Sequence, residues 1–232
     1  MQRIGPDMKL IVYATGNPGK TAEISRRAAL HGLPLTPLTE LLEQPLAVEE
    51  TGKTLGENAL LKVQAHLDAF AQNASLRGKR IYVAADDTGI EIKGLGGEPG
   101  IFVRRWKDRN REMTDAELTD YALERTRHLR GAERDAVFLT TVAVGILNED
   151  GTAKPRIVQY HGKLHGSLYH QPQAAKMKGF PFASLFHVSE WGMCLAEGHG
   201  LSDEERTRLH MADHREKAFD TAMRGIKRMM LY

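Results

Sequence analysis

Residues 9–20 read KLIVYATGNPGK, and the helix formers TAEISRRAAL follow directly. LIVY is a short apolar run of strand formers, which TGNPG then breaks. This pattern predicts a strand, a tight loop and a helix that ends near His31. Such a loop points successive backbone N–H groups at one spot beside the positive end of a helix, close to the side chains of Thr15, Asn17 and Lys20. An anion is the natural guest and phosphate the first hypothesis; the alternative is an ordinary turn.

The composition limits the class of protein. A chain of 232 residues that is 41% hydrophobic can bury a sizeable core, and we favour one domain over residues 1–232. Lys plus Arg (32) nearly balance Asp plus Glu (30), so the charge of +2 gives no sign of a nucleic-acid partner. The single cysteine, Cys194, excludes an internal disulfide and suits a reducing compartment. With no apolar run of membrane-spanning length and no signal-peptide core, we expect a cytoplasmic protein without a membrane partner.

Capping signals and apolar spacing predict the next elements. Thr54 and Glu57 have the spacing of a capping box, and an apolar face follows them, so we expect a helix over residues 55–73. IYVAADD, at residues 81–87, reads as a strand that ends at its two aspartates. A second capping box opens another helix at Thr114, which we expect to stop at Gly131.

The rest of the chain predicts an antiparallel half of the sheet. VFLTTVAVGIL, within residues 136–147, and RIVQYHGKLHG, at residues 156–166, are separated by NEDG and read as a β-hairpin. The glycine-dense residues 94–100 form a loop that lets backbone approach a ligand or another chain closely. GFPFASLF, at residues 179–186, is a further loop, and a closing helix begins near HREKAF.

Acidic residues gather in two places, EETG with Glu57 and the strand end AADD. Hard oxygen ligands suit Mg²⁺, which takes one or two carboxylates and completes its shell with water and substrate phosphates. Neighbouring side chains on a strand face opposite ways, so Asp86 and Asp87 should not share one role. Glu57 has a competing explanation as the capping-box acid, whereas Glu50 lies in an irregular loop. We therefore rank Glu50 above Glu57 as a metal ligand.

Basic side chains are harder to interpret. Lys62 lies beside the apolar face of its helix and could contact phosphate, although most helical lysines are simply solvated. Two histidine pairs have a spacing of four residues: His161 with His165, and His210 with His214. Neither pair has a third ligand in view, so a histidine metal site is not favoured. DHREKAF clusters donors at a helix start, and the alternative is a helix capped by its aspartate.

Four blocks in this order, ATGNPGKTAEI, EETGKTLGENALLK, ADDTGIEIKGLGGEPGIF and HREKA, carry a resemblance. Together they are similar to the Ham1/RdgB family of inosine and xanthosine triphosphate pyrophosphatases. The blocks cover most of the first hundred residues and a C-terminal patch, whereas residues 108–173 contribute little.

The resemblance implies a fold and a reaction. The fold would be α/β, a single elongated domain with a long mixed sheet flanked by helices and two lobes around a substrate groove, usually as a homodimer. The reaction would convert a nucleoside triphosphate and water into the monophosphate and pyrophosphate with Mg²⁺ as cofactor. Its role would be to clear deaminated purine nucleotides from the nucleotide pool.

The resemblance also implies residues at the phosphate end. Thr15, Asn17 and Lys20 match the family's phosphate-binding loop, and Lys62 matches a further phosphate contact. We expect Lys20 to be catalytic and, as a loop lysine, to have few packing contacts.

At the metal site, Glu50 and Asp87 match the family's carboxylates. Asp87 also matches its proposed catalytic base, and Thr88 the hydroxyl beside it. For the base of the nucleotide, Phe180 matches the aromatic that stacks on the purine. His214 with Arg215 matches the pair that contacts the base edge.

Departures from the family concentrate in the base pocket. Where the family typically reads GFGYDPIF, Ala183 replaces an aspartate and Ser184 a proline; in DHR, Asp213 replaces a serine. The basic residue that the family places before that motif is not in register, since Arg206 and Arg208 lie at a longer spacing. We therefore expect discrimination between bases that is weaker, or differently directed, than in typical relatives.

Two alternatives remain open at this stage. ATGNPGKT is one residue from the P-loop pattern of a phosphotransferase, with Ala14 in place of the first glycine. The missing glycine and the predicted antiparallel hairpin count against it. A module that binds a nucleotide without hydrolysing it is the other alternative, and the retained carboxylates count against that.

Overall fold

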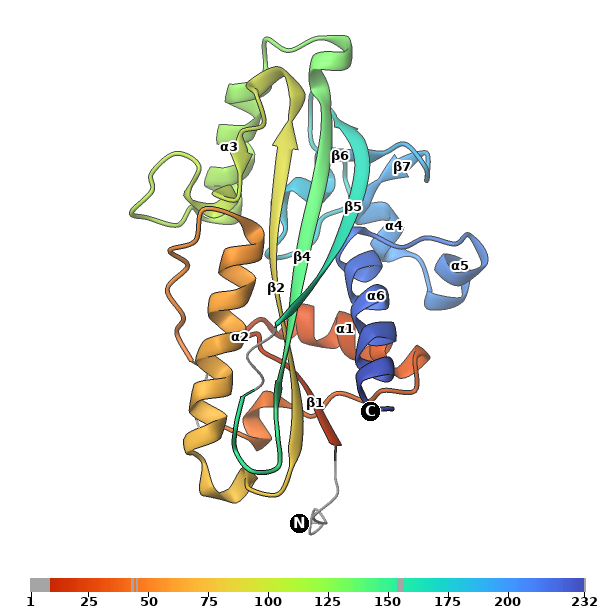
Figure 1. Cartoon of the computed structure of the whole chain (residues 1–232). Coiled ribbons are helices and arrows are strands. Elements are labelled where there is room, and N and C mark those ends of the chain that lie inside the picture. The colour runs from red at the N-terminus through yellow and green to blue at the C-terminus, as the bar shows by residue number, and fades with distance from the viewer. Residues whose placement is uncertain (1–8, 43, 45, 154–156, 232) are drawn as a thin grey trace. The chain divides into compact units, whose positions relative to one another are not determined.

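The computed structural model describes residues 9–42, 44, 46–153 and 157–231 (Figure 1). These residues form two compact units, described separately below. The first unit lies within residues 1–87, 140–162 and 215–232, and the second within 88–139 and 163–214. Among the described residues, no helix has both the length and the hydropathy needed to cross a bilayer.

The predicted mixed α/β fold is confirmed. Seven strands form one sheet in the order β1-β2-β4-β5-β6-β7, with β3 beside β2. Their bounds are β1 (Lys9–Tyr13), β2 (Arg80–Ile92), β3 (Pro99–Gly100), β4 (Asp135–Leu147), β5 (Val158–Leu168), β6 (Phe186–Val188) and β7 (Met193–Cys194). The α-helices are α1 (Pro18–Leu30), α2 (Leu55–Gln72), α3 (Asp115–Thr126), α4 (Leu195–Gly200), α5 (Asp203–Arg208) and α6 (His214–Met229).

In the first unit, alternate residues of each strand pack into different cores. Tyr82 and Ala84 of β2 belong to the core that α1 and α6 share, whereas Val83 and Ala85 belong to the core under α2. Figure 1 shows α2, in orange, on the other side of β1 and β2 from α1 and α6. Because the side chains of a strand alternate, Asp86 continues toward α1 and α6, and Asp87 toward α2.

The first helix begins earlier than predicted. Pro18 is its first residue, so Lys20 lies in the first helical turn rather than in the preceding loop. Proline suits this position because its missing N–H would have no helical partner there. Asp220 of α6 bonds Arg27 of α1, with Nε at 2.7 Å from Oδ1, and also His31, with Nε2 at 2.8 Å. These contacts tie the two helices together within the unit.

The prediction that the strand ends at its aspartates was wrong. β1 pairs in parallel with β2 from Lys9 opposite Arg80 to Tyr13 opposite Ala84, and β2 then runs on to Ile92. The residues TGIEI restore strand-type alternation, with Ile90 and Ile92 buried and Glu91 exposed. Asp86 and Asp87 therefore lie inside a strand.

The second unit has a core of its own. It gathers Phe138 of β4, Leu164 of β5, Phe182 and Phe186 with residues of α3 and α4. β5 pairs antiparallel with β6, and β6 with β7, as expected for this half of the sheet. The predicted loop over residues 179–186 contains a short 3-10 helix, Pro181–Ser184, and the start of β6.

β4 and β5 are sheet neighbours, as the predicted hairpin requires. Their connection closes with a hydrogen bond from Asn148 N to Thr152 O and an antiparallel bridge between Leu147 and Ala153. Arg156, the first residue of the predicted second hairpin strand, lies outside the described residues.

Helix α3 opens on the predicted capping box at Thr114 but ends at Thr126, before the expected Gly131. Thr126 Oγ1 donates to Ala122 O, and the buried Arg134 donates from Nη1 to Thr126 O, each at 2.7 Å. A β-branched residue whose hydroxyl and carbonyl are both engaged suits a helix terminus, because arginine side chains satisfy the last carbonyl groups.

Candidate active site

Asp86 is the centre of a buried polar cluster in the first unit. Lys20 Nζ lies 3.0 Å from Asp86 Oδ2 and 3.2 Å from Oδ1, and Arg215 Nε lies 3.3 Å from Oδ2. The Tyr13 hydroxyl donates a further hydrogen bond to Oδ1. Arg215 Nη1 also reaches Glu23 Oε2 at 3.2 Å. β1, α1, β2 and α6 thus each supply a member of this cluster.

The charged groups of the cluster shift one another's pKa values. Burial opposes ionisation of Asp86, but Lys20 and Arg215 outweigh it and hold the pKa of Asp86 well below its ordinary range. Burial lowers the pKa of Lys20, and Asp86 offsets part of that shift. Burial and the neighbouring Asp86 raise the pKa of Tyr13 well above its ordinary value. Asp86 is therefore a carboxylate at neutral pH.

The turn before α1 is organised by Asn17. Its Oδ1 accepts from the backbone N–H of Gly19 at 2.9 Å and of Lys20 at 3.2 Å, while Thr15 Oγ1 accepts from Asn17 N at 3.2 Å. Asn17 is thus the N-cap of the helix, and these two N–H groups are already bonded. An incoming anion would meet the exposed turn, the positive helix end and the Lys20 ammonium.

Asp87 anchors a second cluster on the α2 side of β2. Asn58 Nδ2 donates to Asp87 Oδ2 at 2.9 Å, and Lys62 Nζ lies 3.7 Å from Oδ1. The same ammonium lies 2.7 Å from Glu50 Oε1 and donates to the backbone oxygen of Asp86 at 2.9 Å. The structure therefore brings Glu50, Lys62 and Asp87 together, with Lys62 between the two carboxylates.

The environment of Asp87 differs from that of Asp86 in its effect on ionisation. Burial raises the pKa of Asp87 to about 6, with Lys62 and Asn58 opposing and Glu50 adding to the shift. For Lys62, burial acts downward, but Asp87 and Glu50 outweigh it and raise its pKa. A carboxyl group with a pKa of about 6 is suited to accept a proton near neutral pH.

The Asp87 cluster also fits a divalent cation. Glu50 and Asp87 already flank one positive charge, and both offer hard oxygen donors. Within the described part of the chain, no three His, Cys, Asp or Glu side chains gather as a closed metal cage would require. A divalent cation held by two carboxylates would complete its shell from water and phosphate.

Glu57, the weaker ligand candidate, has a structural task. Its Oε2 accepts from Lys53 N at 2.6 Å, while its own N–H donates to Thr54 Oγ1 at 3.1 Å. These bonds fix the start of α2 and explain the S/T-x-x-E spacing in the sequence.

The predicted base-binding residues of the second unit form an aromatic cluster. His214 is fully buried and stacks on Phe138, with ring centroids 4.8 Å apart and an interplanar angle of 20°. The half-buried Phe180 lies 5.2 Å from Phe138 and 6.1 Å from His214. Thr88, the first residue of this unit, is half-buried on β2. Arg215 belongs to the first unit, where it pairs with Asp86 and Glu23.

The family departures now have structural explanations. Asp213 is 1% exposed and its Oδ2 lies 2.9 Å from His199 Nε2, so this extra carboxylate is engaged inside the unit. Ala183 is part of the core, and Ser184 Oγ donates to Pro181 O at 3.2 Å. Arg206 of α5, out of register in the sequence, is buried.

Three residues with important contacts had no functional role in the sequence reading. The sequence patterns place Tyr13 in a strand and Glu23 and Asn58 in helices, and assign them nothing more. Helical spacing could have indicated Glu23, because it lies three residues after Lys20 on the same face. Tyr13 and Asn58 carry no local signal of this kind, since their partners are distant in sequence.

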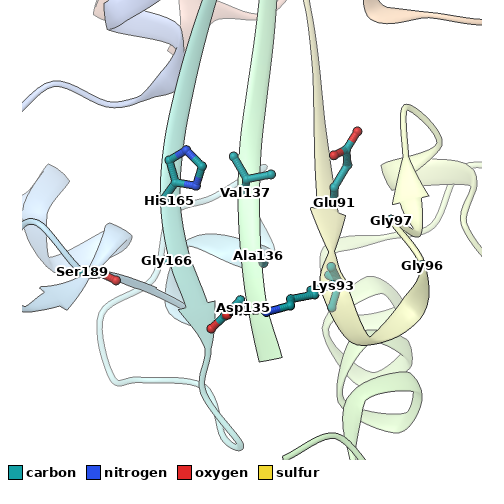
Figure 2. A pocket seen from close by; sticks show the side chains of 11 residues that line it. Glu91, Lys93, Gly96, Gly97, Asp135, Ala136, Val137, His165, Gly166 and Ser189 are labelled. Atoms are coloured by element: carbon teal, nitrogen blue, oxygen red, sulfur yellow. Dashed lines mark hydrogen bonds and ion pairs between the residues drawn. The ribbon is translucent and has the colours of Figure 1, made fainter. Parts of the chain in front are cut away.

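A separate open pocket of 620 Å³ lies in the second unit (Figure 2). Glu91, Val137 and His165 are among the residues that line it. They alternate along their strands with residues of the core, so they lie on the face of the sheet that points away from that core. Lys93 and Asp135 also line it, with Nζ 3.3 Å from Oδ2. It contains none of the residues that the family resemblance assigns to the site.

Comparison with known proteins shows which family this chain resembles. The profile of the Ham1 family matches residues 11–224. The chain is 36% identical over 218 residues to the dITP/XTP pyrophosphatase of Thermus thermophilus, covering 94% of this chain and 91% of that protein. It is 33% identical over 220 residues to the dITP/XTP pyrophosphatase of Yersinia pseudotuberculosis, covering 95% and 99%.

Solved structures of Ham1 proteins also match this chain. A HAM1 protein from Coxiella burnetii matches with a TM-score of 0.70 and 28% identity, over 95% of this chain and 100% of that one. The Staphylococcus aureus Ham1 protein, at 24% identity and a TM-score of 0.69 over 95% and 98%, shares the fold. With a family profile that spans nearly the whole chain and relatives above 30% identity, this protein belongs to the Ham1 family.

Proposed function

We propose that this protein is a hydrolase that converts non-canonical purine nucleoside and deoxynucleoside triphosphates, such as ITP, dITP and XTP, to the monophosphate and pyrophosphate. Membership of the Ham1 family and relatives named dITP/XTP pyrophosphatases support the substrate class. In this role it would remove deaminated purine nucleotides from the nucleotide pool.

The observation that carries the proposal is the arrangement around Asp86 and Asp87. Asp87, with a pKa raised to about 6, lies beside Glu50 and Lys62, while Lys20 is held by the neighbouring Asp86. Two carboxylates, of which Asp87 can also accept a proton, and two ammonium groups are parts that hydrolysis of a phosphoanhydride can use.

Each residue then has a role. Asp87 accepts the proton of the attacking water, and Lys20 and Lys62 neutralise charge on the phosphate chain. Thr15, Asn17 and Thr88 contribute hydroxyl and amide groups to the same end of the nucleotide. Glu50 and Asp87 would hold Mg²⁺, which when bound polarises phosphate oxygens and screens the leaving pyrophosphate.

At the other end of the substrate, Phe180 would stack on the purine, while His214 and Arg215 would contact its edge. Such stacking needs an aromatic face that a ligand can reach, and Phe180 is only half-buried. His214 is stacked on Phe138, so its ring orientation is fixed before a base arrives.

We also propose that residues 1–232 act as a single pyrophosphatase domain, as a cytoplasmic homodimer with neither nucleic acid nor membrane as partner. The near-zero net charge supports the absence of a nucleic-acid partner. Size-exclusion chromatography with light scattering tests the dimer: a mass near 52 kDa supports it, and a mass near the chain's 25.9 kDa contradicts it.

The decisive experiment is incubation with Mg²⁺ and ITP, XTP, dITP, GTP and dATP, with pyrophosphate and orthophosphate measured separately. Pyrophosphate release that EDTA abolishes is the expected result. Orthophosphate alone would favour the P-loop phosphotransferase, and nucleotide binding without hydrolysis would favour the sensing module.

The same panel tests base choice. Discrimination that is weak or differently directed would support the sequence-based hypothesis. A strong preference for ITP and XTP over all the other nucleotides would contradict it. The pairing of Asp213 with His199 reduces the weight of one argument for weak discrimination, because that carboxylate already has a partner inside the protein.

A further inference from the structure

Asn58 makes two hydrogen bonds that join separate parts of the candidate metal site. Its side chain is almost fully buried in α2, at 3% exposure. Oδ1 accepts from the backbone N–H of Gly52 at 2.8 Å, and Nδ2 donates to Asp87 Oδ2 at 2.9 Å. One amide therefore connects β2 with the segment that carries Glu50, two residues before Gly52.

The close packing of Gly52 shows that this segment is fitted to the amide. A Cβ built on Gly52 would lie 2.6 Å from Asn58 Oδ1 and 2.7 Å from Glu57 Cβ. No side chain fits at these distances, so only glycine allows the backbone to approach α2 so closely. The contact sets the distance between the Glu50 segment and the helix that bears Lys62.

The two hydrogen bonds at position 58 require a side chain that both accepts and donates. The asparagine amide accepts with one atom and donates with the other, whereas a carboxylate of the same size only accepts and an alkyl group does neither. Asparagine is also a poorer helix former than alanine or leucine, so helix propensity does not explain its presence in α2.

We propose that Asn58 is a positioning residue that fixes the two metal-site carboxylates relative to each other. By bonding Oδ2 of Asp87, it orients that carboxylate so that Oδ1 faces Lys62, which also bonds Glu50. Through Gly52 it holds the segment of Glu50 against the same helix. The inference rests on the proposed function, in which Glu50 and Asp87 hold a divalent cation.

Two variants separate the two bonds. Asn58→Asp keeps an acceptor for Gly52 but cannot donate to Asp87 and adds a like charge beside it, and Asn58→Ala removes both bonds. Asn73→Ala is the matched control, because Asn73, the C-cap residue that follows α2, is also an asparagine with two backbone partners. Asn73 Nδ2 donates to Leu41 O at 3.2 Å, and its Oδ1 accepts from Ser75 N at 3.0 Å.

The probe is Mn²⁺, whose binding to each full-length variant is followed by electron paramagnetic resonance without turnover, alongside kcat, KM and Tm. Loss of an outer contact to metal ligands typically weakens metal affinity or activity about 10- to 100-fold. We expect weakening of that order in both Asn58 variants. Asn73→Ala should keep the Mn²⁺ affinity and kcat/KM of the wild type within roughly a factor of three, even with a similar loss of Tm.

Wild-type Mn²⁺ affinity and kcat/KM in both Asn58 variants would overturn the inference. So would losses in Asn73→Ala equal to those in Asn58→Ala, because they would reduce the role of Asn58 to general stability. If the wild type releases no pyrophosphate but binds Mn²⁺ with an affinity that falls in the Asn58 variants, the proposed function is overturned and this inference stands. The two failures are therefore distinguishable.

Discussion

The two faces of β2 carry the same residue type at consecutive positions and give it opposite properties. On the face toward α1 and α6, Asp86 is surrounded by Tyr13, Lys20 and Arg215, and its pKa lies well below the ordinary range. On the face toward α2, Asp87 accepts from the neutral Asn58 amide at 2.9 Å and lies 3.7 Å from the Lys62 ammonium, and its pKa is raised to about 6. Both carboxyl groups are buried.

The difference shows that burial alone does not set the pKa of a carboxyl group. Burial acts upward on both residues, and the number and closeness of positive neighbours decides the outcome. A carboxylate saturated with cations is suited to hold other groups in place. A carboxylate with a raised pKa is suited to exchange protons or bind a metal, and substitutions on each face can test this division.

The largest expected effect is that of Asp87→Asn. The amide cannot act as a general base and is a weaker metal ligand, so kcat should fall about 100-fold or more while the fold is retained. Steady-state kinetics on ITP and circular dichroism provide the measurements. If Asp87→Asn keeps near-normal turnover and Asp86→Asn is inactive, the roles of the two faces are reversed.

Lys20→Ala should have the next largest effect. Loss of a charge-assisted contact to phosphate should lower kcat/KM by roughly 10- to 100-fold. The sequence predicted little loss of stability, but Lys20 pairs with the buried Asp86, and removing it should also cost about 1–3 kcal/mol.

Urea unfolding without ligand measures the stability of Lys20→Ala. Lys53→Ala, at an exposed lysine of the same unit, serves as a control. Wild-type kcat/KM in Lys20→Ala would contradict the phosphate role, and unchanged stability would contradict the importance of the pair with Asp86.

The sequence could predict these two faces only in part. Alternation along a strand correctly assigned Asp86 and Asp87 to different sides, and the Thr54–Glu57 spacing correctly predicted the start of α2, although the Glu57 side chain bonds Lys53 N instead of Thr54 N. Motif resemblance identified the family. The phosphate and metal residues Lys20, Glu50, Lys62 and Asp87 lie as two adjoining clusters of one unit, although their roles remain predictions.

What the sequence missed depends on contacts between distant residues. Tyr13 reaches Asp86 across 73 positions and Asn58 reaches Asp87 across 29, so no local pattern reports them. The continuation of β2 beyond Asp87 was missed because two aspartates and a glycine disfavour a strand locally, whereas sheet pairing and buried Ile90 and Ile92 favour it. Tertiary contacts override local propensity at this position.

A smaller effect is expected for Tyr13→Phe. The hydroxyl donates to Asp86, but Lys20 and Arg215 remain as partners, so we expect a stability loss of about 1–2 kcal/mol. Catalysis should stay within roughly threefold of the wild type, because the carboxylate keeps its charge and its lysine. Chemical denaturation and kinetics on the same preparation distinguish this from a catalytic role, which a much larger loss of kcat would indicate.

The smallest expected effect concerns pH and the cost of keeping Asp87 ionised. Its pKa in the folded protein, about 6, lies above the ordinary value of about 4, so the folded state binds more protons between these pH values. Stability therefore falls as pH rises through this window, by at most roughly 3 kcal/mol at about 1.4 kcal/mol per pKa unit. Asp87→Asn removes this cost but also weakens the interaction with Lys62, which leaves a net gain of about 1–2 kcal/mol.

In EDTA at pH 8, Asp87→Asn should consequently unfold at a higher urea concentration than the wild type, and the difference should shrink toward zero near pH 4. Asp86→Asn provides the contrast, because a carboxylate with a depressed pKa stabilises the folded state above pH 4 and its loss should lower stability at pH 8. The two environments require that Asp87→Asn raises the stability at pH 8 and that Asp86→Asn lowers it. Equal destabilisation by both would mean that the surroundings of Asp87 favour its charged form as those of Asp86 do.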